Sequence, residues 1–321
     1  MMEIKNPNHF FAFLRQKGIS SLIVLIVLVG ILLLVKPESM SLSSISSLMD
    51  QASILLLLAS AQCIIIIMGR IDLANATFCS LLTVITALSL NSFGFLAIPV
   101  LIVFAIFVGF LQSWLHQIFQ VPSFVISLAF LGIASGCALV LTSASTILVK
   151  PNVRFTKVLF SSPGDIPISF MLSLFIVGIL GFLLAKTPWG RAVRAIGFNQ
   201  RASTYSGINT FWVMSSAFMV ATTLIAIAST LNVGYLGTAS ASIADSYLLP
   251  GIAAVVVGGT SIAGGIGGIG RTVWGVLIIS VLRIGMDLLH ISQNVQPVVY
   301  GIIIILAIAL TVDRSRVSIV A

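Results

Sequence analysis

Residues 187–209 read TPWGRAVRAIGFNQRASTYSGIN, and the interpretation of the whole chain starts from this stretch. It is the longest water-compatible interruption in an otherwise apolar sequence. It carries Arg191, Arg194 and Arg201 but no carboxylate. A short helix that lies between two membrane spans and is basic on its aqueous side is a natural contact for a soluble partner. We therefore expect the flanking segments to cross a membrane and this segment to receive a soluble protein.

The composition of the chain excludes a soluble fold. The 321 residues are 59% hydrophobic and 7% charged, whereas soluble domains carry about 25% charged residues. The mean hydropathy is +1.19. The apolar runs are long and continuous rather than alternating, which excludes a transmembrane barrel. The sequence therefore predicts an all-α polytopic membrane protein, with a single transmembrane domain over residues 1–321.

The apolar runs set the number of spans. A membrane-spanning helix needs about 20 apolar residues, and counting on that basis predicts about ten spans. No small-residue cleavage site follows the first run, so we expect it to be a retained span. The predicted spans cover residues 19–36, 46–68, 73–90, 94–115, 123–145, 167–186, 211–232, 248–263, 272–289 and 296–312.

The basic residues set the predicted orientation. With ten spans and a cytoplasmic N-terminus, eleven of the 16 lysines and arginines lie in the cytoplasm and four outside. This asymmetry follows the enrichment of Lys and Arg in cytoplasmic loops. It places both termini and residues 187–209 in the cytoplasm. It also explains the net charge of +8 without nucleic acid as a partner.

The predicted outer segment between the fifth and sixth spans carries Lys150, Arg154 and Lys157. One interpretation is a solvated loop. The other is a docking patch for an acidic surface of an extracellular solute-binding protein, through charge complementarity.

Motifs for chemistry are absent from the sequence. The dipeptide Gly-Lys does not occur, so there is no phosphate-binding loop of the GxxxxGK[ST] type. The histidines form no HExxH motif, and the three cysteines lie in apolar runs without CxxC spacing. We expect no catalytic residue, no metal site and no cofactor in this chain. Active transport would then need a partner ATPase or an ion gradient.

An ion-coupled carrier keeps ionisable residues at membrane depth. The candidates here are Asp50, Asp72, Arg283 and Asp287, which is a thin set for a proton or sodium relay. Arg283 and Asp287 are spaced i, i+4, and we expect them to pair on one helix face.

Glycine is concentrated at the end of the eighth predicted span, with seven glycines in residues 258–270. Small residues let helices approach closely. Non-helical backbone at membrane depth is tolerated where it is buried or lines a cavity. Residues 69–75, GRIDLAN, are a milder version of the same pattern.

Four segments stand out together: DQA at 50–52 leading to GRIDL at 69–73, VPSFV at 121–125 with Leu128, residues 187–209, and YLLP at 247–250 followed by IAAVVVGGTS at 252–261 with Gly264 and Gly265. These segments resemble the inner-membrane permease subunits of bacterial ABC importers for monosaccharides, of the ribose, xylose and galactose type. The first segment departs from the family pattern, since Arg70 stands where a small residue is usual and Ala74-Asn75-Ala76 replaces Ser-Val-Gly. In the fourth, Leu248 and Pro250 stand where the family often has an acidic residue, a variant also seen in the family.

The resemblance implies a bacterial inner-membrane complex. It implies a second permease chain, identical or homologous, cytoplasmic ATPase domains that bind ATP and magnesium, and a periplasmic solute-binding protein. The loop at 187–209 would carry the coupling helix, which inserts into a groove of the ATPase and transmits a rigid-body push. The residues to which we assign coupling are Gly190, Arg191, Arg194, Ala195, Gly197, Asn199, Ser206, Gly207 and Ile208.

We therefore interpret the chain as the permease subunit of an ATP-driven importer for a monosaccharide or related small polar solute, working by alternating access. The alternatives are an ABC permease for branched-chain amino acids or nucleosides, and a secondary carrier that works alone. A sugar needs hydrogen-bonding groups but no fixed charge along its route. Each candidate pathway residue has an alternative role as a buried polar group satisfied by neighbouring helices. The candidates are Gln62, Asp72, Asn75, Thr77 and Asn232.

Overall fold

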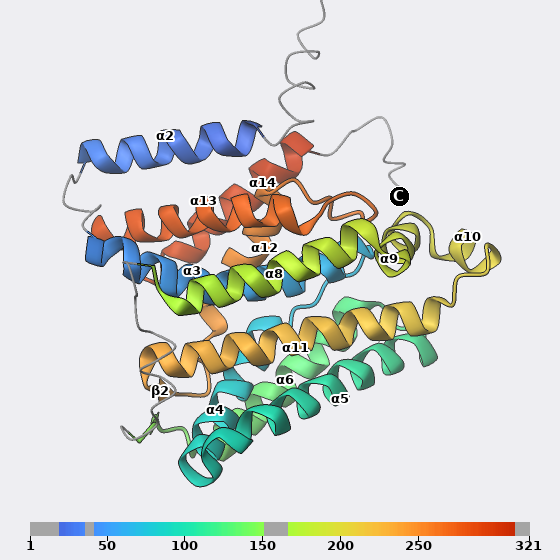
Figure 1. The fold of residues 1–321 in the computed structure, drawn as a ribbon, viewed down its shortest axis with the longest axis horizontal. Helices are drawn as coiled ribbons and strands as arrows, with labels where there is room; N and C mark the ends of the chain where they lie inside the picture. The colour runs from blue at the N-terminus through green and yellow to red at the C-terminus, as the bar shows by residue number, and fades with distance from the viewer. Residues whose placement is uncertain (1–18, 36–41, 151–165, 312–321) are drawn as a thin grey trace, which may run out of the picture.

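The computed structural model describes residues 19–35, 42–150 and 166–311, and these are mostly helical (Figure 1). Two short strands, β1 (Ile147–Leu148) and β2 (Thr238–Ala239), pair antiparallel, with Ile147 opposite Ala239. The α-helices are α2 (Ile19–Val35), α3 (Leu42–Ile67), α4 (Asn75–Phe93), α5 (Ala97–Ile118), α6 (Ser123–Thr142), α8 (Ile168–Lys186), α9 (Pro188–Phe198), α10 (Gln200–Tyr205), α11 (Thr210–Leu236), α12 (Leu248–Val257), α13 (Ile269–Leu288) and α14 (Gln296–Thr311), with 3-10 turns η2 (Gly94–Leu96) and η4 (Asp245–Tyr247).

Seven helices in the described ranges are long and apolar enough to cross a membrane: α3, α4, α5, α6, α8, α11 and α13. Three shorter apolar helices accompany them, at Val24–Leu34, Asp245–Val257 and Gln296–Ile308. The prediction of an all-α polytopic membrane protein is confirmed. The count of ten spans and the cytoplasmic position of both termini stay predictions.

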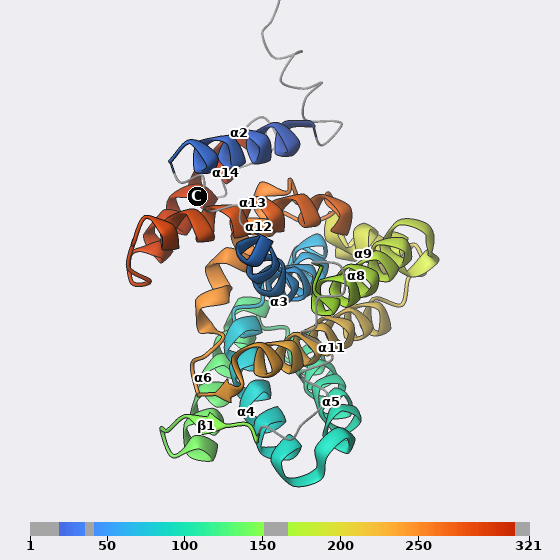
Figure 2. The same cartoon turned by 60° about the vertical axis from the view of Figure 1, so that its left-hand side comes forward.

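Helix α3 forms the centre of the molecule. Its most apolar window is 94% buried, whereas that of α6 is 17% buried. A helix that is apolar all round needs neighbours on every side, and α3 packs against α8, α11, α12 and α13. Figure 2 shows α3 between α13 and α12 on one side and α11 on the other.

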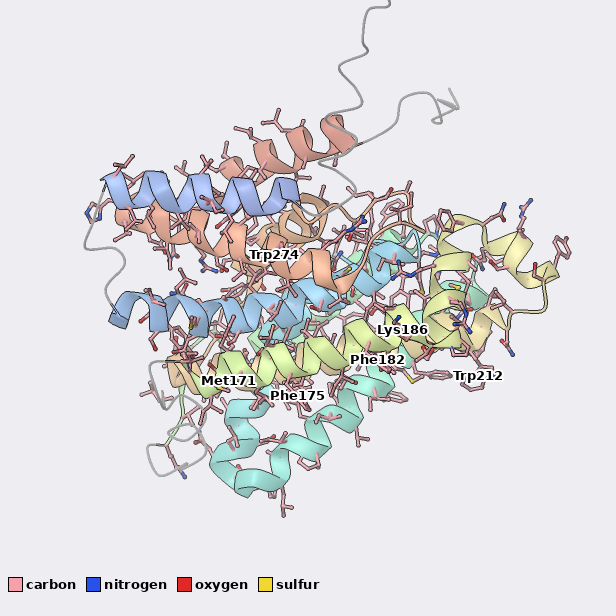
Figure 3. All side chains as sticks on the ribbon, turned by 45° about the horizontal axis from the view of Figure 1, so that its top comes forward. Met171, Phe175, Phe182, Lys186, Trp212 and Trp274 are labelled. Atoms are coloured by element: carbon pink, nitrogen blue, oxygen red, sulfur yellow. The ribbon has the colours of Figure 1, made fainter. Side chains whose placement is uncertain are left out.

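The outer helices turn apolar side chains away from the core. Met171, Phe175 and Phe182 lie along α8 (Figure 3), and Phe175 is 67% exposed. Their spacing of four and seven residues places them on one face of that helix. A large exposed apolar surface must be covered by lipid or by another protein. The peripheral helices therefore fit a membrane environment.

The eighth predicted span, residues 248–263, is helical only in its first ten residues. Helix α12 ends at Val257, and residues 258–268 form a non-helical turn before α13. The turn depends on glycine, since Gly259 and Gly264 have φ of +88° and +90°. Side chains with a Cβ rarely adopt this left-handed backbone. Glycine density therefore shortened the helix where apolar composition predicted that it would continue.

Candidate functional site

Residues 187–209 fold into two short helices, α9 and α10, which lie at one end of the bundle (Figure 1, right). Side-chain caps fix where each helix begins. The Gly190 N–H donates to Thr187 Oγ1 over 3.3 Å, and the Ala202 N–H donates to Asn199 Oδ1 over 3.0 Å. Such caps satisfy backbone donors that a helix start leaves without partners. Asn199, assigned to coupling by sequence, is thus also the residue that separates α9 from α10.

The inward face of α9 packs on the end of α8 and on the core. Gly190, Val193 and Ile196 are buried at a spacing of three residues. A Cβ built on Gly190 would lie 2.2 Å from the Leu184 carbonyl oxygen, which is inside van der Waals contact. Glycine at 190 is therefore required for α9 to fold back against α8.

Three segments meet backbone to backbone at the C-terminal end of α9. A Cβ on Gly197 would lie 1.9 Å from the Ile67 carbonyl oxygen, at the end of α3. The Gly265 N–H donates to the same oxygen over 2.8 Å. A Cβ on Gly264 would lie 2.7 Å from the Gly69 Cα. We call Gly69, Gly197, Gly264 and Gly265 the glycine junction, because it brings α3, α9 and the 258–268 turn into direct contact.

Two arginines strengthen this junction from either side. Arg194 Nη1 donates to the Gly267 carbonyl oxygen over 2.6 Å, and Arg70 Nη2 donates to Gln200 Oε1. The sequence placed Arg194 on the aqueous side of the segment, whereas the structure turns it inward against the 258–268 turn. Arg70, which departs from the family pattern, gains a partner on α10. The glycine density of 258–270 was the sequence signal for this contact, but it did not reveal the partner segments.

The outward face of α9 and α10 combines cations with aromatic rings. Arg191 and Arg201 are exposed, as are Ser206 and Gly207, while Ala195 and Ile208 are half-buried. Phe198 is 67% exposed and Tyr205 is 90% exposed. Trp212 follows at the start of α11 (Figure 3) and stacks on Phe110 with ring centroids 6.4 Å apart. Aromatic residues and arginine are the types enriched in protein–protein contacts, so this face is suited to a protein partner.

Four of the five candidate pathway residues lie at the same end of the bundle, since Thr77 follows Asn75 on the first turn of α4. Asn75 Nδ2 donates to Gln62 Oε1 over 3.1 Å. Asp72 Oδ1 accepts from the Ala74 N–H over 2.9 Å and from Gln112 Nε2 over 3.2 Å. Burial raises the pKa of Asp72 above its ordinary value, while these two hydrogen bonds oppose the shift. The hydrogen bonds form two buried pairs, Asn75 with Gln62 between α4 and α3, and Asp72 with Gln112 of α5.

Thr77 is 5% exposed and lies on the same turn of α4 as Asn75. The fifth candidate is placed differently. Asn232 is 1% exposed, and neither atom of its side-chain amide has a hydrogen-bond partner. It lies 22 residues after Thr210 on α11, about 33 Å along that helix. Asn232 is therefore not brought together with Gln62, Asp72 and Asn75. Buried polar atoms without partners are rare enough to mark a site of interest.

The predicted docking patch is described only in part. Lys150 is exposed beside β1, and its backbone N–H donates to Asn91 Oδ1 over 3.0 Å. Figure 1 places the β1–β2 end opposite α9 and α10. Arg154 and Lys157 lie outside the described residues.

The predicted pairing of Arg283 with Asp287 is wrong. Asp287 Oδ1 accepts from Gln296 Nε2 over 2.7 Å, and the Arg283 guanidinium lies over the Tyr247 ring, 4.7 Å from its centroid. A pair with the cation N-terminal to the anion has the less favourable order along a helix. The sequence spacing permitted the pair, but residues from η4 and α14 supply better partners. Within the described ranges no three His, Cys, Asp or Glu side chains are grouped as a metal site requires.

Comparison with known proteins relates this geometry to a family. Residues 44–308 match the model of the family described as branched-chain amino acid transport system / permease component. The ribose import permease protein of Bacillus subtilis (strain 168) is 32% identical over 96% of this chain and 95% of its own length. The ribose import permease protein of Haemophilus influenzae is 30% identical over 90% and 91%. The galactose/methyl galactoside import permease protein of Escherichia coli K12 is 28% identical over 96% and 97%. No solved structure matches the chain.

Proposed function

Because the chain belongs to the family of branched-chain amino acid transport system permease components, a family of ABC import subunits, we propose that it carries a monosaccharide or related small polar solute across the bacterial inner membrane. The observation that carries this proposal is its likeness, over nearly its whole length, to import permeases named for ribose and galactose. The chain is a transport subunit rather than an enzyme, so ATP and magnesium bind to a separate ATPase.

The character of the interior supports a neutral solute. Most of the buried polar side chains are hydroxyls and amides, and few are charged. A branched-chain amino acid carries an ammonium and a carboxylate, and each would need a compensating charge along a dry route. We therefore favour a sugar over the amino acid that the family description names.

We propose that α9 and α10 couple the permease to the ATPase. In this proposal ten spans place both termini and residues 187–209 in the cytoplasm. Gly190, Arg194 and Gly197 hold α9 rigidly to α8, α3 and the 258–268 turn. The exposed residues Arg191 and Ser206, with the aromatic side chains beside them, contact the ATPase. A push on α9 then moves the end of α3, because no flexible side chain separates their backbones at the glycine junction.

The remaining assignments complete the proposed cycle. A second permease chain, identical or homologous, forms the other wall of the route. The solute-binding protein docks through Lys150, Arg154 and Lys157 on the opposite side. Solute passes polar groups at Gln62, Asp72, Asn75, Thr77 and Asn232. Among these, Asn232 has the strongest support, because both atoms of its amide are without partners.

Reconstitution tests the proposal. The chain is placed in liposomes with the ATPase and solute-binding protein of the same importer, and uptake of labelled D-ribose, D-xylose and D-galactose is measured with and without ATP. We expect ATP-dependent accumulation of at least one sugar by the assembled complex and none by the chain alone. Accumulation against a gradient by the chain alone would show a secondary carrier and overturn the proposal. Uptake of leucine or a nucleoside in place of any sugar would overturn the substrate class.

A further inference from the structure

A cleft opens at the end of the bundle opposite α9 and α10. It has a volume of about 70 Å³ and is lined by residues of η4, α12, α13 and α14 and of the turn before α14; Figure 2 shows α12, α13 and α14 in the upper part of the molecule. Arg283 also borders a smaller cavity, of 10 Å³, which Gln51 and Ser280 line. Gln51 and Ile67 are 16 residues apart on α3, so about 24 Å separates this region from the glycine junction. The polar residues that line the cleft are Asp245, Ser246, Arg283, Gln293, Gln296 and Tyr300.

Polar atoms without partners gather at this cleft. Tyr300 is 2% exposed, and its hydroxyl has no hydrogen-bond partner. Arg283 Nη1 is likewise buried without a partner, and so is Ser280 Oγ on the side of the smaller cavity. Burying such groups without hydrogen bonds costs free energy. A ligand that forms hydrogen bonds with these atoms would remove that unfavourable term.

The charges around the cleft favour a neutral ligand. The Asp245 carboxylate is at the rim, where its Oδ1 accepts from Ser80 Oγ over 2.8 Å. The Asp287 carboxylate is bonded to Gln296, which lines the cleft. Two carboxylates and one guanidinium, Arg283, leave a formal excess of one negative charge, which disfavours an anion. A cation is disfavoured by the positive charge of Arg283, whose Nη1 lacks a hydrogen-bond partner.

The mixture of donors and acceptors fits hydroxyl groups. Arg283 and Tyr300 donate, Asp245 accepts, and the amide of Gln293 does both. A sugar hydroxyl also donates and accepts, so adjacent hydroxyls of one ring can bond to both kinds of residue. At about 10–15 Å³ for each water-sized position, the cleft has room for about five such positions. This is enough for one edge of a monosaccharide ring.

We propose that this cleft, formed by Asp245, Arg283, Gln293, Gln296 and Tyr300, is an outer subsite that binds the hydroxyl groups of a neutral monosaccharide before it enters the permease. The inference rests on the proposed function for its ligand class and on the orientation that places α9 and α10 in the cytoplasm. None of the pathway residues assigned above belongs to this site.

The test measures sugar binding to the full chain in lipid nanodiscs, without ATP, by saturation-transfer difference NMR. The probes are D-ribose, D-xylose and D-galactose, with D-galacturonate and inorganic phosphate as anionic comparisons. We expect at least one neutral sugar to bind to the wild type. We expect its affinity to fall about five-fold or more in Tyr300→Phe and in Gln293→Ala, since each variant removes one hydrogen-bonding group. Asn294→Ala is the matched control, because Asn294 is an exposed neighbour of Gln293 that does not line the cleft.

Three outcomes would overturn the subsite: no neutral sugar binds, both variants bind like the wild type, or galacturonate binds more tightly than galactose. Gln293 is exposed, so its variant tests the site even if Tyr300→Phe does not fold. The uptake assay described above separates the two proposals. ATP-driven import with unchanged binding in the variants rejects only the outer subsite, whereas accumulation by the chain alone rejects the proposed function.

Discussion

Asp72 shows how a single buried carboxyl is held in the turn between α3 and α4. Its Oδ1 accepts from the Ala74 N–H and from Gln112 Nε2. Burial nevertheless raises its pKa above the ordinary value of 3.8. The folded protein therefore binds a proton more tightly at this residue than the unfolded chain does. Its contribution to stability is fully present below the ordinary pKa and is lost as pH rises toward the raised value.

The direction of this pKa shift gives a prediction for the variant Asp72→Asn. Asparagine keeps the Oδ1 acceptor but cannot ionise, so it avoids the cost of a buried charge at high pH. We expect the variant to gain thermal stability relative to the wild type as pH rises from 4.5 to 8. The measurement is the unfolding midpoint of both proteins in detergent across this range. A wild type that becomes the more stable protein at pH 8 would show instead that the ionised carboxylate is favoured there.

The sequence identified several charged residues of interest but did not predict their partners. The i, i+4 spacing of Arg283 and Asp287 suggested an ion pair, yet Tyr247 and Gln296, from other elements, are their partners. Arg194 was counted with the exposed arginines and instead donates to Gly267. Sequence spacing describes neighbours along one helix, whereas these partners come from segments more than a turn of helix away.

At the scale of elements, α9 is joined to the core through its backbone rather than through side chains. The Ile67 carbonyl oxygen lies where a Cβ on Gly197 would stand, and Gly265 donates to that oxygen. Such close approach is possible only with glycine. Position 197 therefore sets the distance between α9 and α3.

We predict that Gly197→Ala separates α9 from α3. The added methyl would collide with backbone that has little room to move, and overpacking of this kind costs about 1–3 kcal/mol. We expect a lower unfolding midpoint together with reduced stimulation of ATP hydrolysis by loaded binding protein in the assembled complex. Gly178→Ala on α8 is the control, because a Cβ there meets nothing within 4 Å. Normal stimulation in Gly197→Ala would remove the coupling role from this contact.

The predicted helix ends agree with the structure where a polar residue or a proline ends the apolar run. The predicted span 167–186 is confirmed as α8 (Ile168–Lys186), which Pro167 and Thr187 flank. The predicted span 123–145 is three residues too long, since α6 ends at Thr142. The helix in the predicted span 248–263 stops at Val257, because the residues that follow are apolar but include glycines with positive φ. Hydropathy measures transfer into lipid and carries no information about backbone conformation.

At the scale of the whole molecule, the two ends of the bundle have different characters. One end carries α9 and α10, with exposed arginines and aromatic rings. The other carries β1, β2 and Lys150. This polarity agrees with the proposal of a different partner at each end.

We predict that Lys150→Glu, Arg154→Glu and Lys157→Glu together weaken binding of the solute-binding protein. Reversing three charges replaces attraction with repulsion toward an acidic surface, and salt screens both. We expect the loss of affinity to be larger at 20 mM than at about 300 mM salt, where the Debye length is much shorter. Surface plasmon resonance on nanodiscs measures it, and Arg191→Glu, at the opposite end, is the control. Equal affinity at low salt would leave these three residues as a solvated loop.

The sequence by itself determined the class of the protein and most of its helices. These follow from composition and from the length of apolar runs, which act locally along the chain. Only the tertiary structure decided that Gly69, Gly197, Gly264 and Gly265 form one junction and that Arg283 and Tyr300 share a cleft with Gln296. Those contacts join residues far apart in sequence, and their energy depends on the distances that the packed helices impose.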